Sequence, residues 1–184
     1  MELLRTDRLL LRHWDESDLA AFFDLYSREE VARWLGAHPR RPLATVGEAR
    51  ERLSRWHEHE RGLTPPFGLW AVVPCAEGSE PGQPAGTLLL LPLSDDHGPT
   101  GLVEVGWHLH PQYQGQGFAT EAARAVLARA GKAGIDQVLA ITDLDNVASQ
   151  RVAERLGMTD EGVTERWFGL TARQYRKVTS LQES

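Results

Sequence analysis

The sequence contains little of what disulfide-bonded, metal-cluster, membrane or nucleic-acid-binding proteins require. Cys75 is the single cysteine among 184 residues, which excludes an internal disulfide and a thiolate metal cluster. Apolar runs stay well below the roughly 20 residues that a transmembrane helix needs. Acidic residues outnumber basic ones, 26 to 20, and a net charge of −6 disfavours a general nucleic-acid binder. We therefore expect no metal, no nucleic acid and no membrane among the partners.

The N-terminus also lacks the layout of a signal peptide, because Met1-Glu-Leu-Leu-Arg5 leads directly into a predicted strand. The default expectation is a cytoplasmic protein. A hydrophobic content of 41% and a charged content of 25% are ordinary for a globular protein. A chain of this length can bury one sizeable core. We expect a single domain over 1–184, as a monomer or a homodimer.

The clearest functional pattern lies between residues 102 and 121. Leu102 to Leu109 is rich in β-branched, aromatic and leucine side chains and predicts a strand. His110-Pro111 ends it, because proline cannot donate to a sheet. A glycine-rich turn over 114–119 follows, and an alanine-rich helix begins at Thr120. The first N–H groups of such a helix are unpaired, and the helix dipole places partial positive charge beside them. Because glycines let an anion come close to this backbone, the turn predicts a phosphate site that needs no lysine.

The residues of the turn restrict which phosphate-containing ligand it can bind. A Walker loop needs Gly-Lys-Ser/Thr, which is absent, and Thr120 stands where a dinucleotide fingerprint has its third glycine. The run Gln114-Gly-Gln-Gly-Phe-Ala119 instead resembles the acetyl-CoA loop, Q/R-x-x-G-x-G/A, of the GNAT superfamily of N-acetyltransferases.

Downstream residues strengthen this resemblance. A second apolar strand over 136–142 leads to a helix over 146–156, which Asn146 or a neighbour can cap and Gly157 can end. Asn146-x-x-Ser149 followed by Val-Ala-Glu-Arg-Leu-Gly-Met resembles the next GNAT motif. The branch it resembles acetylates ribosomal-protein N-termini, the RimJ/RimL type. Matches to the same branch are Leu9-Leu-Leu-Arg12 after Thr6-Asp-Arg8, and Glu104-Val-Gly-Trp107.

Period and capping patterns predict the remaining elements. The expected strands are 8–13, 67–73, 85–93, 158–167 and 170–179, with a long hairpin loop over 74–84. Expected helices begin after Asp15, at a Ser27-x-x-Glu30 capping box and at a Thr45-x-x-Glu48 capping box. The last of these has an expected core stripe of Val46, Ala49, Leu53 and Trp56.

The order of these elements predicts an α/β fold. The crossover from Leu109 to Asp136 should make two strands parallel, and such a pair can separate at its carboxyl ends. The resemblance implies a GNAT-like mixed, mostly antiparallel twisted sheet with a central splayed parallel pair and flanking helices.

The resemblance also implies acetyl-CoA as co-substrate, with its pantetheine arm paired to backbone in the splay. Leu109 and His110 would then offer backbone to the arm, and Asn146 and Ser149 would border it. The residues expected to cradle the pyrophosphate are Gln114, Gly115, Gln116, Gly117, Phe118, Ala119 and Thr120.

Acetyl transfer to an amine needs a base and a proton donor. Glu104 is the candidate base, because burial in an apolar strand would raise the pKa of its carboxyl; orienting a cationic substrate or pairing with an arginine is the alternative. Ala153 stands where many GNAT enzymes have a tyrosine, so the resemblance favours Ser149 as donor. Tyr175 is the second candidate.

We therefore predict an acetyl-CoA-dependent N-acetyltransferase that acts directly on an amine-bearing acceptor, for which the branch resemblance favours a protein N-terminal α-amine. The alternatives are a small-molecule amine, such as an aminoglycoside or an amino acid, and a non-catalytic acyl-CoA sensor. The sequence does not fix the acceptor.

Overall fold

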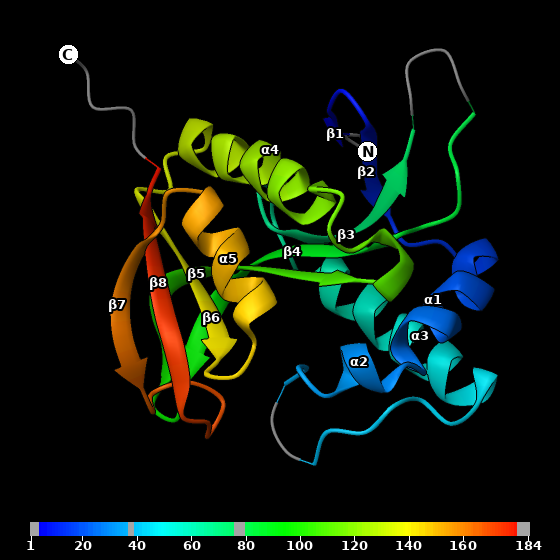
Figure 1. Ribbon diagram of the computed structural model, residues 1–184, viewed down its shortest axis with the longest axis horizontal. Coiled ribbons are helices and arrows are strands. Elements are labelled where there is room, and N and C mark those ends of the chain that lie inside the picture. The colour runs from blue at the N-terminus through cyan, green and yellow to red at the C-terminus, as the bar shows by residue number, and fades with distance from the viewer. Residues whose placement is uncertain (1–3, 37–38, 76–79, 180–184) are drawn as a thin grey trace.

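The structure of the chain is a computed structural model that describes residues 4–36, 39–75 and 80–179. It is built on one eight-stranded sheet in the order β1-β2-β3-β4-β5-β6-β8-β7 (Figure 1). The strands are β1 (Leu4–Arg5), β2 (Leu9–His13), β3 (Gly68–Pro74), β4 (Gly86–Asp95), β5 (Gly98–Leu109), β6 (Gln137–Asp143), β7 (Thr159–Thr164) and β8 (Ala172–Val178). The helices are α1 (Leu19–Tyr26), α2 (Glu29–Ala32), α3 (Val46–Arg61), α4 (Phe118–Lys132) and α5 (Val147–Arg155), with 3₁₀ turns at Glu16–Asp18 and Pro111–Tyr113.

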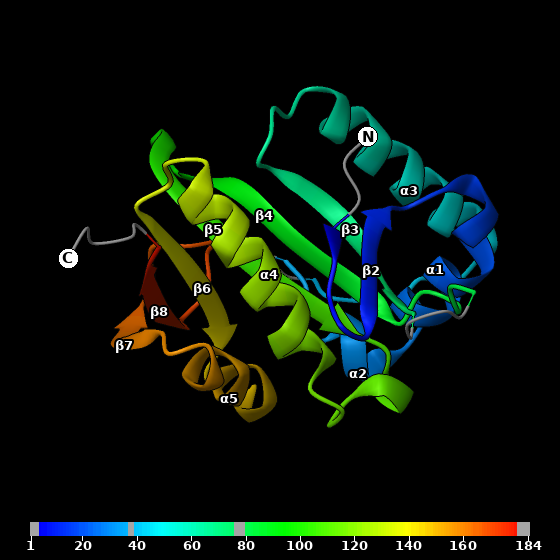
Figure 2. The same cartoon turned by 90° about the horizontal axis from the view of Figure 1, so that it is seen from above.

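Alternating side chains of the sheet build a core on each face. In β2, Leu9 and Leu11 belong to the cluster that α4 covers, whereas Leu10 belongs to the cluster under α1 and α3. This division follows from the two-residue period of a strand. The result is three layers, with α4 and α5 on one face of the sheet and α1 and α3 on the other (Figures 1 and 2).

The sheet is antiparallel except where the α4 crossover makes β5 and β6 parallel. The register between these two strands contains the single pair Glu104 and Leu139. Beyond it, β5 runs on to Leu109 beside β4, and β6 runs on to Asp143 beside β8. Their carboxyl halves therefore separate, and the predicted splayed pair within a mixed α/β sheet is confirmed.

The predicted closing hairpin is also present, as antiparallel β7 and β8. The last strand, β8, lies between β6 and β7, so it fills an internal position of the sheet. The predicted loop over 74–84 joins β3 to β4, and its residues 76–79 lie outside the described residues. In the part of the chain that is described, we find no helix with the length and apolarity to span a membrane.

Two predicted capping boxes need correction. Ser27 does not cap α2: it follows the end of α1, and its hydroxyl donates to the Asp24 carbonyl at 3.2 Å, so α2 begins after Arg28 without a side-chain cap. Thr45 does cap α3 by accepting from Glu48 N at 3.2 Å, but the Glu48 carboxylate accepts from Ala44 N instead of closing the box.

The predicted core stripe of α3 is also partly wrong. Val46, in the first turn, is 45% exposed, so full burial begins at Ala49 and continues at Leu53.

Candidate functional site

Two cavities open where β5 and β6 separate, and they are lined from opposite faces of the sheet. The α4–α5 cavity, about 410 Å³, is lined by the first turns of α4 and α5. The α1–α3 cavity, about 400 Å³, is lined by α1, α3 and the end of β6. Both share Trp34, Leu35, Trp107, His108, Asn146 and Ser149. Two molecules bound from opposite faces would therefore meet at the splay.

Most of the predicted cofactor residues line the α4–α5 cavity. These are Leu109, Gln114, Gly115, Gly117, Phe118, Ala119, Thr120, Asn146 and Ser149. Gln116 is not among them, because its side-chain amide donates to Gln112 O at 2.9 Å and its carbonyl accepts from Arg8.

The structure gives no support to the predicted backbone role of His110. Its N–H donates to Ala85 O at 2.9 Å, beside β4, and its Nε2 lies 3.1 Å from Asp24 on α1. Because successive residues of a strand direct their N–H and C=O groups to opposite sides, Leu109 and Trp107 face the splay instead. The Leu109 carbonyl there accepts from the Gln114 side chain at 3.1 Å.

The start of α4 has the features of a phosphate site. The helix begins at Phe118, two residues before its predicted start, and its N-cap, Gly117, has φ +83° and provides no side-chain cap. The first N–H groups are therefore free for an anion. Thr120 Oγ1 is buried beside them with no partner among the described residues. A Cβ on Gly115, at φ +76°, would project into open space, so these groups fit a pyrophosphate.

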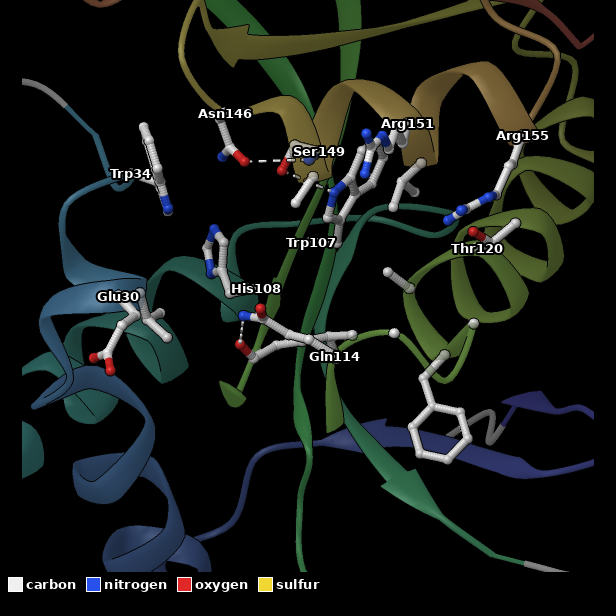
Figure 3. A pocket seen from close by; sticks show the side chains of 18 of the residues that line it. Glu30, Trp34, Trp107, His108, Gln114, Thr120, Asn146, Ser149, Arg151 and Arg155 are labelled. Atoms are coloured by element: carbon white, nitrogen blue, oxygen red, sulfur yellow. Dashed lines mark hydrogen bonds between the residues drawn. The ribbon is translucent and has the colours of Figure 1, made fainter. Parts of the chain in front are cut away.

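Arg151 and Arg155 add positive charge to this cavity and were missed in the sequence. Both are exposed on α5 and line this cavity, and Figure 3 shows the Arg155 side chain on the side of Thr120. Their i, i+4 spacing on the predicted helix already places both arginines on one face, and this spacing could have identified them from the sequence.

Ser149 lies at the boundary between the two cavities. Asn146 Oδ1 accepts from Ser149 N at 3.1 Å and so caps α5 as predicted. The Trp107 indole N–H donates to Ser149 Oγ at 3.3 Å (Figure 3). Because an indole can only donate, Ser149 retains its own hydrogen for an acceptor in the cavity.

Glu104 lines the α1–α3 cavity on β5. Its side chain forms no ion pair with any described residue, so the pairing with an arginine that the sequence left open is not observed. Desolvation raises the pKa of the Glu104 carboxyl to about 8. The other titratable or charged residues that line this cavity are Tyr26, Arg40, Arg52, His108 and Asp143.

His108 is a further residue that the sequence pattern did not indicate. A chain of buried hydrogen bonds holds its ring: Trp14 Nε1 donates to Thr87 Oγ1 at 3.1 Å, Thr87 and Tyr26 hydroxyls lie 2.7 Å apart, and Tyr26 OH lies 3.1 Å from His108 Nδ1. These residues are up to 94 positions apart in sequence, counted from Trp14 to His108.

We assign the tautomer of His108 from the direction that satisfies the most members of this chain of hydrogen bonds. Thr87 is fully buried and accepts from Trp14, so its own hydrogen has one described acceptor, Tyr26. With Thr87 donating to Tyr26, Tyr26 donates to His108 Nδ1, and the ring hydrogen is assigned to Nε2. Desolvation, aided by Arg52, lowers the pKa of His108 to about 4, so the ring is neutral at physiological pH.

Tyr175, the second candidate donor, lies elsewhere. It is 2% exposed, belongs to the core cluster with Ala153 and Met158, and lines neither of the two cavities. Its position gives no support to a role in proton transfer.

An arginine fixes the segment that carries Trp34 and Leu35. Arg40 donates to Gly36 O at 2.8 Å, to Arg33 O at 2.9 Å and to Asp143 Oδ1 at 2.8 Å. Its side chain is 6% exposed. The segment after α2 is thereby attached to the end of β6, where it lines both cavities.

Known proteins share this architecture. Residues 8–159 match the family model for the acetyltransferase (GNAT) domain. The chain is 26% identical over 167 residues to an uncharacterised N-acetyltransferase of Bacillus subtilis, YoaA, with 90% of this chain and 88% of the relative covered.

Solved structures show the same fold. RimL, the ribosomal L7/L12 alpha-N-protein acetyltransferase in complex with coenzyme A, superposes with a TM-score of 0.74 at 21% identity, covering 96% of this chain and 98% of that one. The Salmonella typhimurium acetyltransferase that modifies the N-terminal serine of L7/L12 gives 0.73 at 21% identity, covering 96% and 99%. Since the family model spans most of the sequence and the sheet has the splayed parallel pair, this chain belongs to the GNAT family of acetyltransferases and is an acyltransferase.

Proposed function

We propose that this enzyme is an acetyl-CoA-dependent N-acetyltransferase that acetylates an α-amine directly, in a complex of both substrates. The observation that carries the proposal is the meeting of two cavities at the splay, with Glu104 in one and Ser149 at their boundary. The fold neighbours named as protein N-terminal acetyltransferases support a protein N-terminus as acceptor.

Acetyl-CoA, the co-substrate of GNAT acetyltransferases, supplies the acetyl group as a thioester. The free N–H groups of the first turn of α4, with Thr120 Oγ1, would hold the pyrophosphate. Arg151 and Arg155 would add positive charge beside it. Trp107 and Leu109 direct backbone groups towards the splay, where the pantetheine arm would pair.

Glu104 would take the proton of the acceptor amine. Its raised pKa, about 8, lies close to the ~7.8 of an α-amine, so the proton moves between groups of similar basicity. At neutral pH, deprotonation costs about 1 kcal/mol for an α-amine and about 4.6 kcal/mol for a lysine near ~10.4. The Ser149 hydroxyl would donate a hydrogen bond to the sulfur of the CoA thiolate as it leaves.

The test is acetylation of two matched peptide sets by the intact protein. One set carries a free N-terminus and no lysine, and the other a blocked N-terminus and one lysine. Thiol release and mass spectrometry should find the label mainly on the first set. Label mainly on lysine would contradict the α-amine preference. Binding of acetyl-CoA without thiol release on any amine would favour a sensor instead.

A further inference from the structure

The α1–α3 cavity contains a cationic side chain that the mechanism above does not use. Arg52, on α3, lines this cavity and is half-buried, with its guanidinium carbon 5.6 Å from the centre of the Tyr26 ring. No described carboxylate forms an ion pair with it. Glu48, one turn earlier on α3, is occupied by Arg41 and by Ala44 N. Burying a charge without a partner is costly, so an anion there would be favourable.

His108 presents a second donor in the same part of the cavity. Its ring packs edge-on against Tyr26, with centroids 5.9 Å apart, so His108 and Arg52 both contact this one tyrosine. The hydrogen-bond chain through Thr87 leaves a hydrogen on His108 Nε2, and no described residue accepts it. Figure 3 shows the His108 ring on the side of the site that carries Trp34.

A third unused donor lies on the β6 side. The hydroxyl of Thr142 is buried, lines the α1–α3 cavity and has no described hydrogen-bond partner. The other arginine in this cavity, Arg40, is already neutralised by Asp143 at 2.8 Å. Arg52 therefore provides the charge of this cavity that is available to a ligand.

Within the α1–α3 cavity, the donors Arg52 and His108 lie apart from the carboxylate of Glu104. Glu104, Gly106 and His108 share one face of β5, because side chains at alternate positions of a strand point the same way. Gly106 adds no side chain between the other two. Glu104 can therefore receive an amine while Arg52 and His108 face another part of the same molecule.

From these contacts we infer that the acceptor carries a carboxylate near its amine, and that Arg52 and His108 bind this carboxylate. The inference rests on the proposed function, since it assigns the acceptor to the α1–α3 cavity. Guanidinium and imidazole N–H groups are strong donors to a carboxylate. The carboxylate has two sources: a free amino acid, or an acidic residue directly after the N-terminal residue of a peptide.

The test measures binding and turnover separately. Calorimetry on protein saturated with CoA, which cannot react, compares serine with serinamide and Ser-Asp-Gly-amide with Ser-Asn-Gly-amide. The wild type should bind the acid of at least one pair about tenfold or more tightly than its neutral partner, which corresponds to ~1.4 kcal/mol. The pair that shows the preference identifies the source of the carboxylate.

Variants connect the preference to its residues. Arg52→Gln should reduce the ratio of acid to neutral affinity about tenfold and leave the neutral ligand nearly unaffected, and His108→Phe should reduce it in the same direction. Arg50→Gln is the matched control, because Arg50 is exposed on the same helix and lines neither cavity. Comparing the same ligands in each protein cancels differences in their amine pKa values.

The outcomes for the two proposals are distinct. Equal affinity for acid and neutral ligands in the wild type, or a ratio unchanged by Arg52→Gln, overturns the inference even where acetyl-CoA turnover on amines is normal. A preference that depends on Arg52 supports the carboxylate site formed by Arg52 and His108. Absence of thiol release with the preferred ligand would then contradict the proposed function, because that ligand would be bound but not acetylated.

Discussion

The basicity of the Glu104 carboxylate comes from its desolvated position on β5. In water its carboxyl would be ionised at neutral pH and too weak a base, but desolvation raises its pKa to about 8. We expect kcat/KM of the wild type to rise with pH through an acidic limb near that value, because the carboxylate is the active form. Glu104→Gln should lower kcat by roughly 10²–10⁴-fold and leave in this limb only the ionisation of the acceptor amine, with acetyl-CoA affinity nearly unchanged. An intact limb in a normally active E104Q would leave Glu104 with a structural role.

Ser149 is the second residue for which the structure suggests a test. Its hydroxyl accepts from Trp107 and lies at the junction of the two cavities, with its own hydrogen left for an acceptor there. Ser149→Ala should therefore lower turnover by about 10²-fold while changing CoA affinity little, measured by steady-state kinetics beside calorimetry. Tyr175→Phe is the comparison, because Tyr175 is buried and lines neither cavity. If the tyrosine variant lost turnover and the serine variant did not, the donor assignment would be reversed.

At the scale of elements, the turn before α4 is where the cofactor site depends on backbone shape. Gly115 has φ +76° and open space at its Cβ position, which is the space a phosphate would use. Gly115→Val should weaken CoA binding at least about tenfold, or ~1.4 kcal/mol, by obstruction as well as by strain.

Gly134 offers a control for the strain. It has φ +81° and open space at its Cβ position, but it follows the other end of α4 and lines neither cavity. Gly134→Val should cost similar stability and leave CoA affinity unchanged in calorimetric titration. Equal CoA affinity in the two variants would remove the loop from the phosphate site.

For the whole molecule, the desolvated carboxyl of Glu104 connects stability to pH. The Glu104 pKa is 4.5 in its ordinary state and about 8 in the folded chain, so between these values the folded state binds more protons than the unfolded state. The contribution of this group to the free energy of unfolding must then fall as pH rises from about 4.5 to about 8, and level off above. Urea unfolding across this range should show a decline in the wild type that E104Q lacks. Parallel curves for the two proteins would contradict the raised pKa.

Local sequence patterns determined much of this protein. The glycine turn at 114–119, the Asn146 cap and the i, i+4 arginines of α5 depend on residues within one or two turns of each other, where spacing fixes geometry. The parallel crossover followed from strand, helix and strand in order, and the family resemblance implied the splay. Glu104 could be identified because a charged residue stands in an apolar strand.

The tertiary structure decided the rest, because those features join distant residues. The direction of the His110 N–H depends on its register with β4. The position of β8 inside the sheet depends on its pairing with the edge of β6 that β5 leaves free. Tyr175, a candidate donor in the sequence, packs in the core for the same reason: residues distant in sequence surround it. The acceptor side is the clearest case: Trp14, Tyr26, Thr87 and His108 come from a loop, a helix and two strands, and only their packing gives His108 its tautomer and places it beside Arg52.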